Sequence, residues 1–532
     1  MASHFLHRPV TFARRGMVVA PHYLAAEAGL ELLKAGGNAL DAAVAASAML
    51  QIVYPFVCGL GGDIFMIIYD VASGKLHGLN GSGRSAQAAT IERYRDLGYT
   101  TMPVLGIHTV TVPGCVGGWD EAEERFGRLG LAQALAPAIS YAEEGVAVGP
   151  DLHAALTRTS VREGIHRSWH THFLQGGSVP PAGAVIRFPT LARTLRTIAK
   201  DGATAFYRGE IAEQIAAFFA REGGLITRDD LAVHQSEWVT PLSVPFAGLR
   251  IYELPPNTQG VTALQMLSIL DRLPLGDSPL SPDTIHMAVE TKKLAFADRD
   301  AYLTDPAHMR VNPTALIEPG YLTQRRALID PARAQLSVAP GSFGGDTVYL
   351  CTADREGNVV SLIQSNYMGF GSGVVVDDTG IVLQNRGAYF SLDPASANAL
   401  APAKRTLHTL IPSLALRDGR PAMVFGTMGG DGQPQIHLQV YTAAARFGLN
   451  IQAAIELPRW IHGAANGTAT LHVESRFPPE TLQALRQRGH MVEELGAWET
   501  GMGYAQGITF DPFAGVMQGG ADPRAESLAA AW

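Results

Sequence analysis

Apolar and polar positions near the N-terminus repeat with the spacing of two consecutive helices. The stretch LAAEAGLELLKAGG (24–37) is amphipathic at a helical period, and its terminal glycine pair is typical of a helix C-terminus. Asn38 then precedes ALDAAVAASAMLQIV (39–53), which predicts a capped second helix whose alanines allow close packing. In GLGGDIFMIIYD (59–70) a glycine-rich turn leads into a continuous apolar run, which predicts a buried strand.

Further along the chain, helical blocks alternate with strand-like ribbons. Residues 130–300 are mostly helical in pattern, and DTIHMAVETKKLAFADRDAYL (283–303) predicts one long helix. Residues 325–346 lack periodicity and predict an exposed, extended loop. After it, TVYLCTADREGNVVSLIQS (347–365) contains two alternating runs around a polar turn, the signature of a β-hairpin. This alternation favours an α/β or α+β layered fold.

Composition narrows the class of protein. Hydrophobic residues make up 47% of the 532 residues and charged residues 17%, which favours a compact, well-buried protein. The formal net charge of −8 provides no basic stripe for nucleic acid, so a small molecule is the expected partner. No stretch reaches 18 uninterrupted apolar residues, and we expect a cytoplasmic enzyme with no membrane contact.

Cysteine and histidine spacing does not predict a metal site. Cys58, Cys115 and Cys351 form no CxxC pair, and Cys351 falls in a strand-like run, so core packing is its expected role. The histidines of HRSWHTH (166–172) include a pair four residues apart that could bind a metal, although no carboxylate or thiolate completes a ligand set nearby. A polar helix face is the preferred interpretation.

The loop-to-strand junction GSFGGDTVYL (341–350) offers a different chemistry. A threonine at a chain terminus carries its own base, because its α-amine has a pKa of about 8 and lies beside the hydroxyl. Such a terminus forms if the Thr347 hydroxyl attacks the Asp346 carbonyl and the resulting ester is hydrolysed. A threonine that merely opens a strand is also common, so the junction alone leaves both interpretations open.

A set of ordered motifs extends over nearly the whole chain. It comprises GGNALDAAVAASAML, GLGGDIFMIIYD, GSGRSA, VPGCVGGW, the Gly-Asp-Thr junction, FGSGVVVDDTGIVLQN, KRTLHTLIPS, FGTMGGDGQPQ and GGADPR. With these motifs the chain resembles the γ-glutamyltransferase (glutathione hydrolase) family of N-terminal-nucleophile hydrolases, and among them the acylase-like members without a lid. The resemblance implies an α+β four-layer αββα sandwich. It also implies cleavage into a large subunit, residues 1–346, and a small subunit, residues 347–532.

The resemblance assigns roles to individual residues. Thr347 becomes the nucleophile, with autocleavage between Asp346 and Thr347, and Ser365 supports its amine. The backbone N–H groups of Gly429 and Gly430 become the oxyanion hole, a role that suits an unobstructed glycine turn. Arg84 matches the arginine that binds the carboxylate of the acyl donor, for which a planar guanidinium is suited.

The donor pocket departs from the pattern of the family's transferases. Tyr367 stands in place of an asparagine, Arg386 in place of a glutamine, and Tyr389 in place of the aspartate that binds the donor's α-amine. His408 and Thr409 replace a serine pair, and the segment 390–404 is short for a lid over the site. Loss of the aspartate and gain of an arginine favour an acyl group that carries an anion and no amine.

Together these features predict an autoprocessed amidohydrolase that acts on small anionic acyl donors. The family resemblance implies that these donors are γ-glutamyl amides such as glutathione. Oxamate and glutaryl amides are the rival donors, and hydrolysis is favoured over transfer because no lid shields the acyl-enzyme. An unprocessed, non-catalytic binding protein is the alternative of another class. We expect no metal or organic cofactor, and a dimer of processed units is left open.

Overall fold

The computed structural model describes residues 8–335, 346–463, 469–511 and 514–532. Two seven-stranded sheets of antiparallel pairs form its centre. The first runs in the order β1 (Thr11–Ala13), β20 (Val516–Ala521), β19 (Ala505–Asp511), β15 (Arg420–Thr427), β14 (Ser413–Arg417), β9 (Leu249–Glu253) and β8 (Leu242–Phe246). The second runs β21 (Leu528–Ala531), β2 (Gly16–Ala20), β10 (Asp346–Asp354), β11 (Val359–Tyr367), β3 (Asp63–Asp70), β4 (Lys75–Gly81) and β7 (Glu237–Val239).

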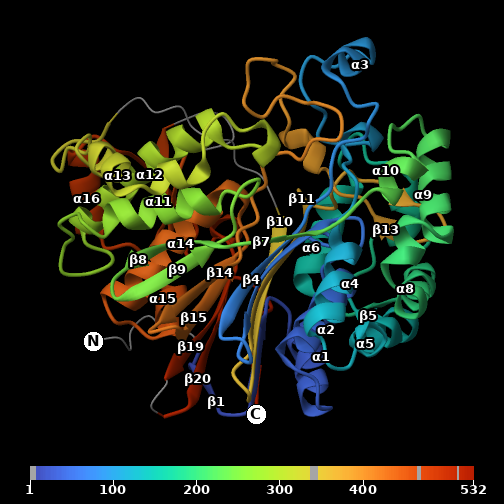
Figure 1. Ribbon diagram of the computed structural model, residues 1–532, viewed down its shortest axis with the longest axis horizontal. Helices are drawn as coiled ribbons and strands as arrows, with labels where there is room; N and C mark the ends of the chain where they lie inside the picture. The colour runs from blue at the N-terminus through green and yellow to red at the C-terminus, as the bar shows by residue number, and fades with distance from the viewer. Residues whose placement is uncertain (1–7, 336–345, 464–468, 512–513) are drawn as a thin grey trace.

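Helices cover the outer face of each sheet (Figure 1). The second sheet is covered by α1 (Tyr23–Lys34), α2 (Ala39–Val53), α4 (Cys115–Phe126), α5 (Leu131–Glu144), α8 (Pro189–Tyr207) and α9 (Glu210–Arg221). The first sheet is covered by α11 (Gly260–Leu270), α12 (Pro282–Tyr302), α13 (Pro319–Arg326), α14 (Gln433–Tyr441), α15 (Ile451–Glu456) and α16 (Pro479–Gln487). A third apolar cluster fills the space between the two sheets. The predicted four-layer αββα sandwich is therefore confirmed.

The segments before and after the Asp346–Thr347 junction build one core. Strand β10 pairs with β2 on one side and with β11 on the other, and β11 pairs in turn with β3. Because β2 and β3 precede the junction while β10 and β11 follow it, a cut at this point would leave the two parts interleaved in one sheet.

Several local predictions are confirmed. Asn38 caps α2 through a capping box with Asp41, and α12 spans the predicted long helix. The hairpin is β10–β11, and the expected strand after the first glycine turn is β3. Cys351 is fully buried between the two sheets. Within the expected loop at 325–346, α13 ends at Arg326 and residues 327–335 form no helix or strand and lie at or near the surface, as predicted. Residues 336–345 lie outside the described residues.

Within the mostly helical stretch 130–300, the strands β7, β8 and β9 occupy residues 237–253. They are short, and β8 contains Pro245, which removes a ladder donor and weakens the strand signal. The proline is tolerated because β8 is the edge strand of its sheet. Across the described residues, no helix has both the length and the apolar character needed to cross a membrane.

Candidate active site

Thr347 lies near the start of β10, at an irregularity in its pairing with β11. Asp346 pairs with Tyr367 and Val348 with Gln364, so the register shifts by one residue across Thr347. The Thr347 side chain is fully buried, and its hydroxyl donates to Ser365 Oγ at 3.1 Å. The bulge therefore holds this hydroxyl beside the bond that processing would cut.

Backbone strain is concentrated at the same point. Tyr367, the pairing partner of Asp346, has a φ of 80°, in the left-handed region that costs an aromatic residue about 1–3 kcal/mol. Its N–H donates to Ser365 Oγ at 2.7 Å, which holds the strained residue in place. Ser365 Oγ thus bonds both the candidate nucleophile, Thr347, and Tyr367, the strand partner of Asp346.

Arg386 is a buried cation with an unused face. It begins the short helix η4 (Arg386–Tyr389) and is 1% exposed. Its Nη1 donates to Thr409 Oγ1 at 3.1 Å, and its guanidinium carbon lies 4.1 Å from the centre of the Tyr367 ring. Its Nε and Nη2 atoms have no hydrogen-bond partner in the described part of the chain. Burial lowers the pKa of Arg386, because a desolvated charge without a full set of partners is unfavourable.

The His408 side chain faces Asp63. His408 Nδ1 accepts from the Leu410 N–H at 3.3 Å, so the proton lies on Nε2, which donates to Asp63 Oδ2 at 3.0 Å. Burial raises the pKa of Asp63 to about 7, although the positive charge of Arg386 opposes this shift. Burial and the same arginine lower the pKa of His408 well below its usual value. The histidine is therefore neutral near pH 7.

Gly429 and Gly430 form a tight turn after β15. Their φ angles are 130° and 51°, a combination that favours glycine at both positions. The Gly430 carbonyl accepts from Gln259 Nε2 at 3.0 Å, which fixes the turn from one side. Over the described residues, neither glycine N–H donates to a protein acceptor. Two free amides in one turn are a suitable cradle for a developing oxyanion.

Asp431, directly after these glycines, connects the turn to the tyrosines of the pocket. Its Oδ1 accepts from the Tyr389 hydroxyl at 2.6 Å and from Arg299 Nη1. The Tyr389 ring meets the Tyr367 ring edge-on, with 5.6 Å between the ring centres. A continuous series of contacts therefore runs from Thr347 through Ser365 and the two tyrosines to the glycine turn.

Arg84 is the predicted site residue that stands apart from this group. Its guanidinium bonds Asp305 Oδ2 at 3.0 Å, Glu237 Oε1 at 3.2 Å and the Ala403 carbonyl at 3.1 Å. Its side chain is 38% exposed, and it lines a cavity of about 200 Å³ that Arg405 also lines. Glu237 also pairs with Arg405, so the two carboxylates balance the charges of these two arginines.

Four functional candidates were missed from the sequence, namely Asp63, Gln259, Arg299 and Asp431. Asp63 belongs to the Gly61–Asp63 turn, and its register partner is Ser365, which places it beside the nucleophile. Gly62 is required there, because a Cβ would lie 2.4 Å from the Ser365 carbonyl oxygen. Gln259 and Arg299 come from distant helices. The threefold repetition of Gly-Gly-Asp was the available signal, because all three copies supply residues to this site.

The histidines at 166–172 do not form a site together. His166 caps the short helix α7 (Arg167–Phe173) and its Nε2 lies 3.3 Å from Glu222 Oε2. His172 is stacked on Phe188, and burial lowers its pKa to about 4. These contacts agree with the preferred interpretation of a polar helix face, although His172 is more buried than that interpretation implies.

An αββα sandwich with a buried threonine at the start of a central strand defines the class of N-terminal-nucleophile hydrolases. The model of the gamma-glutamyltranspeptidase family matches residues 25–532, and the chain belongs to this family. It is 41% identical over 519 residues to the glutathione hydrolase-like YwrD proenzyme of Bacillus subtilis, covering 96% of this chain and 98% of the relative. It is 42% identical over 530 residues to the oxamate amidohydrolase proenzyme of Klebsiella pneumoniae, covering 97% and 98%.

Among solved structures, the chain is similar to cephalosporin acylase from Bacillus halodurans, with a TM-score of 0.93 and 45% identity over 99% of this chain and 97% of that one. The resemblance found in the sequence is therefore confirmed at the level of family, fold and enzyme class. The chain is an N-terminal-nucleophile hydrolase of the gamma-glutamyltranspeptidase family.

Proposed function

We propose that the chain is a self-processing amidohydrolase whose donor is a small amide carrying a carboxylate and no α-amine. The unused Nε and Nη2 atoms of Arg386 support this proposal best. Two parallel N–H groups of a guanidinium match a carboxylate in a bidentate arrangement. Oxamate and glutaryl amides present such a carboxylate. Arg386 thereby takes the role that the resemblance gave to Arg84, whose charge is already paired.

Processing comes first in the proposed mechanism. The Thr347 hydroxyl attacks the Asp346 carbonyl carbon, the peptide C–N bond breaks, and an ester joins the two residues. Water then hydrolyses the ester, which leaves a carboxylate on residue 346 and a free amine on Thr347. The strained pairing of Asp346 with Tyr367 supports this step, because strain at the junction is relieved by the cut.

Turnover uses the new amine as the base. It takes the proton from the Thr347 hydroxyl, whose oxygen attacks the amide carbonyl of the donor, and the Gly429 and Gly430 N–H groups stabilise the oxyanion. The protonated amine passes its proton to the leaving nitrogen. Water, deprotonated by the same amine, attacks the acyl-enzyme ester, and the acid product leaves with Thr347 regenerated.

A gel tests whether the chain processes itself. At 56.7 kDa for 532 residues, a cut before Thr347 divides the mass 346:186 and gives fragments of about 37 and about 20 kDa. The smaller fragment should begin with threonine, and Thr347→Ala should stay full-length and inactive. A wild-type protein that stays intact on long incubation would establish the non-catalytic alternative.

Two arginine variants test the donor. Arg386→Gln should raise KM for oxamate and glutaryl-anilide by about 100-fold, because each charged hydrogen bond is worth about 1.5–3 kcal/mol. KM for γ-glutamyl-anilide should rise less. Arg84→Gln is the matched variant, and a larger rise there than in Arg386→Gln would return the carboxylate to Arg84.

γ-Glutamyl amides remain the second candidate, and one observation favours them. Asp431 Oδ2 is buried and has no hydrogen-bond partner among the described residues, so it could accept from a substrate ammonium. The donor panel separates the two proposals. A kcat/KM for glutathione that exceeds those for oxamate and glutaryl-anilide would favour the γ-glutamyl donor.

A further inference from the structure

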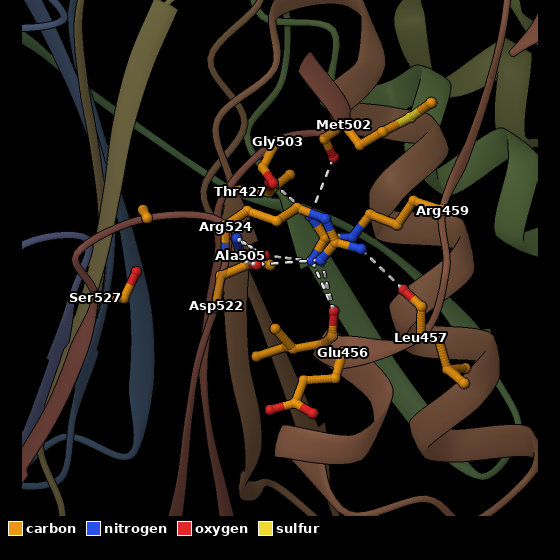
Figure 2. Close-up of polar contacts among 12 residues, drawn as sticks. Thr427, Glu456, Leu457, Arg459, Met502, Gly503, Ala505, Asp522, Arg524 and Ser527 are labelled. Carbon is orange, nitrogen blue, oxygen red and sulfur yellow. Dashed lines mark hydrogen bonds and ion pairs between the residues drawn. The ribbon is translucent and has the colours of Figure 1, made fainter. Parts of the chain in front are cut away.

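A buried network of charged side chains joins the LPRW segment (457–460) to the C-terminal GGADPR motif (519–524). Its members are Arg459, Glu474, Asp522 and Arg524, each at most 4% exposed. Figure 2 shows the two guanidinium groups meeting Asp522 between α15 and the end of β20. Arg476 joins these four residues through Glu474 Oε2 at 2.6 Å. So many ionised groups out of water need a reason beyond packing.

The two arginines share Asp522 and differ in most of their other partners. Arg524 binds Glu474 in a bidentate pair, with Nε to Oε1 at 2.7 Å and Nη2 to Oε2 at 2.5 Å. Both arginines also bind backbone carbonyls, those of Ile455 and Leu457 in the case of Arg524. Arg459 Nη1 donates to the Met502 and Gly503 carbonyls at 3.0 and 2.5 Å. Its Nη2 donates to Asp522 Oδ2 at 2.6 Å (Figure 2).

Asp522 binds the same backbone segment. The carboxylate oxygen that accepts from Arg459 also accepts from the Ala505 N–H at 2.8 Å. Burial alone would raise the pKa of Asp522, but the two arginines and the backbone amides hold it below its usual value. Arg459 and Asp522 therefore grip residues 502–505 from both the carbonyl and the amide side.

Residues 502–505 form the support beneath the glycine turn. The Tyr504 carbonyl accepts from the Met428 N–H at 3.2 Å, directly before Gly429. Gly503 has a φ of 84°, and a Cβ there would lie 2.5 Å from the Met428 carbonyl oxygen. A Cβ on Gly429 would lie 3.8 Å from the Gly503 Cα. The turn and its support are thus in direct contact.

We infer that Arg459 and Asp522 are a positioning pair for the oxyanion donors, acting through residues 502–505. The inference rests on the proposed role of the Gly429 and Gly430 amides. An ammonium cannot replace the planar fork of Arg459, which binds three backbone carbonyls and a carboxylate at once. If the oxyanion donors move by a fraction of an ångström, the stabilisation of the transition state falls more than the affinity for the substrate does.

The test compares Arg459→Lys with Arg524→Lys in the processed enzyme. Both residues are buried and both bind Asp522, but of the two only Arg459 donates directly to residues 502–505. We expect kcat of Arg459→Lys to fall by about 30- to 100-fold with KM within threefold. The inhibition constant of a boronic acid analogue of the donor, whose tetrahedral adduct carries the oxyanion, should rise in parallel. Arg524→Lys should lose as much thermal stability yet keep kcat within threefold.

Asp522→Asn keeps the size of the side chain and is the second variant, measured in the same way if Arg459→Lys does not fold. An unchanged kcat in both Arg459→Lys and Asp522→Asn, or an equal fall in Arg524→Lys, would reduce the network to a stabilising role. Gly429→Ala distinguishes the two levels of failure. If it lowers kcat while the Arg459 and Asp522 variants do not, only the positioning inference fails, and if none of them lowers it, the proposed oxyanion role fails as well.

Discussion

Ser365→Ala is expected to slow the self-cleavage of the precursor by about 30- to 1000-fold. The change removes the acceptor of the Thr347 hydroxyl, a bond worth about 0.5–1.5 kcal/mol. It also leaves the buried Tyr367 N–H without this acceptor, at a further cost of about 1–3 kcal/mol. Together the two losses come to about 1.5–4.5 kcal/mol, and the middle of this range, about 2–4 kcal/mol, corresponds to about 30- to 1000-fold because each 1.36 kcal/mol is tenfold in rate. Both hydrogen bonds hold groups at the cleavage site, so we assign the whole loss of free energy to the activation barrier of self-cleavage.

The assay is the disappearance of the full-length band over time, in precursor purified at once at low temperature. Ser361→Ala is the matched control, because Ser361 lies on the same strand, is equally buried, and bonds the Tyr349 hydroxyl at 2.8 Å. It should cost about 1–3 kcal/mol of stability and leave the cleavage rate within threefold. Ser365→Thr restores the hydroxyl and should recover most of the rate.

Two outcomes would refute this reasoning. Cleavage of Ser365→Ala at the wild-type rate would show that the hydroxyl pair does not orient Thr347 for attack. An equal slowing in Ser361→Ala would show that the rate follows general stability of the hairpin. In either result the alignment of the nucleophile must come from elsewhere in the site.

Two further predictions concern the groups behind the nucleophile. Asp63→Asn removes a carboxyl group whose pKa in the folded protein, about 7, lies above its value of about 4 in the unfolded chain. In the wild type, the contribution of this group to the free energy of unfolding is therefore complete below about pH 4 and is lost as the pH rises through 7. The stability of the variant relative to wild type, measured by urea unfolding, should therefore be higher at pH 8 than at pH 5, and the opposite order would place an ionised carboxylate opposite His408. Tyr389→Phe leaves Arg299 as the remaining partner of Asp431 Oδ1 among the described residues. It should lower kcat by about 10-fold, the lower end for one hydrogen bond to a carboxylate. An unchanged kcat would show that the turn is held without this bond.

The parts of the fold that could be predicted from the sequence are those with local causes. The cap at Asn38 and the polar turn of the β10–β11 hairpin are set by neighbours a few residues away, so their patterns were sufficient. The edge strand β8 was missed because its pairing energy comes from β9 and the sheet beyond it. A proline within it also weakened the alternating pattern.

The candidate site was predictable only in part, for a physical reason. Thr347 and Gly429 stand in motifs whose sequence context is short and specific. Asp63, Arg299 and Arg459 act through partners more than 40 residues away, and nothing in their own segments names those partners. The pairing of Arg84 with two carboxylates is likewise a product of tertiary structure. The presence of Arg84 in its motif was predictable, whereas its ion pairs with two carboxylates were not.

Charge balance explains why the pocket favours an anion. Arg299 pairs with the buried Asp431 and also with Asp300 near the surface. Arg386 lies near the carboxyl groups of Asp63 and Asp431, but burial raises the pKa of Asp63 to about 7 and Asp431 is already paired with Arg299. Among the described residues Arg386 itself forms no ion pair, and a buried charge without a paired counterion is costly unless a ligand supplies one. A carboxylate on the donor would complete this balance, whereas a donor ammonium would add a second cation to it.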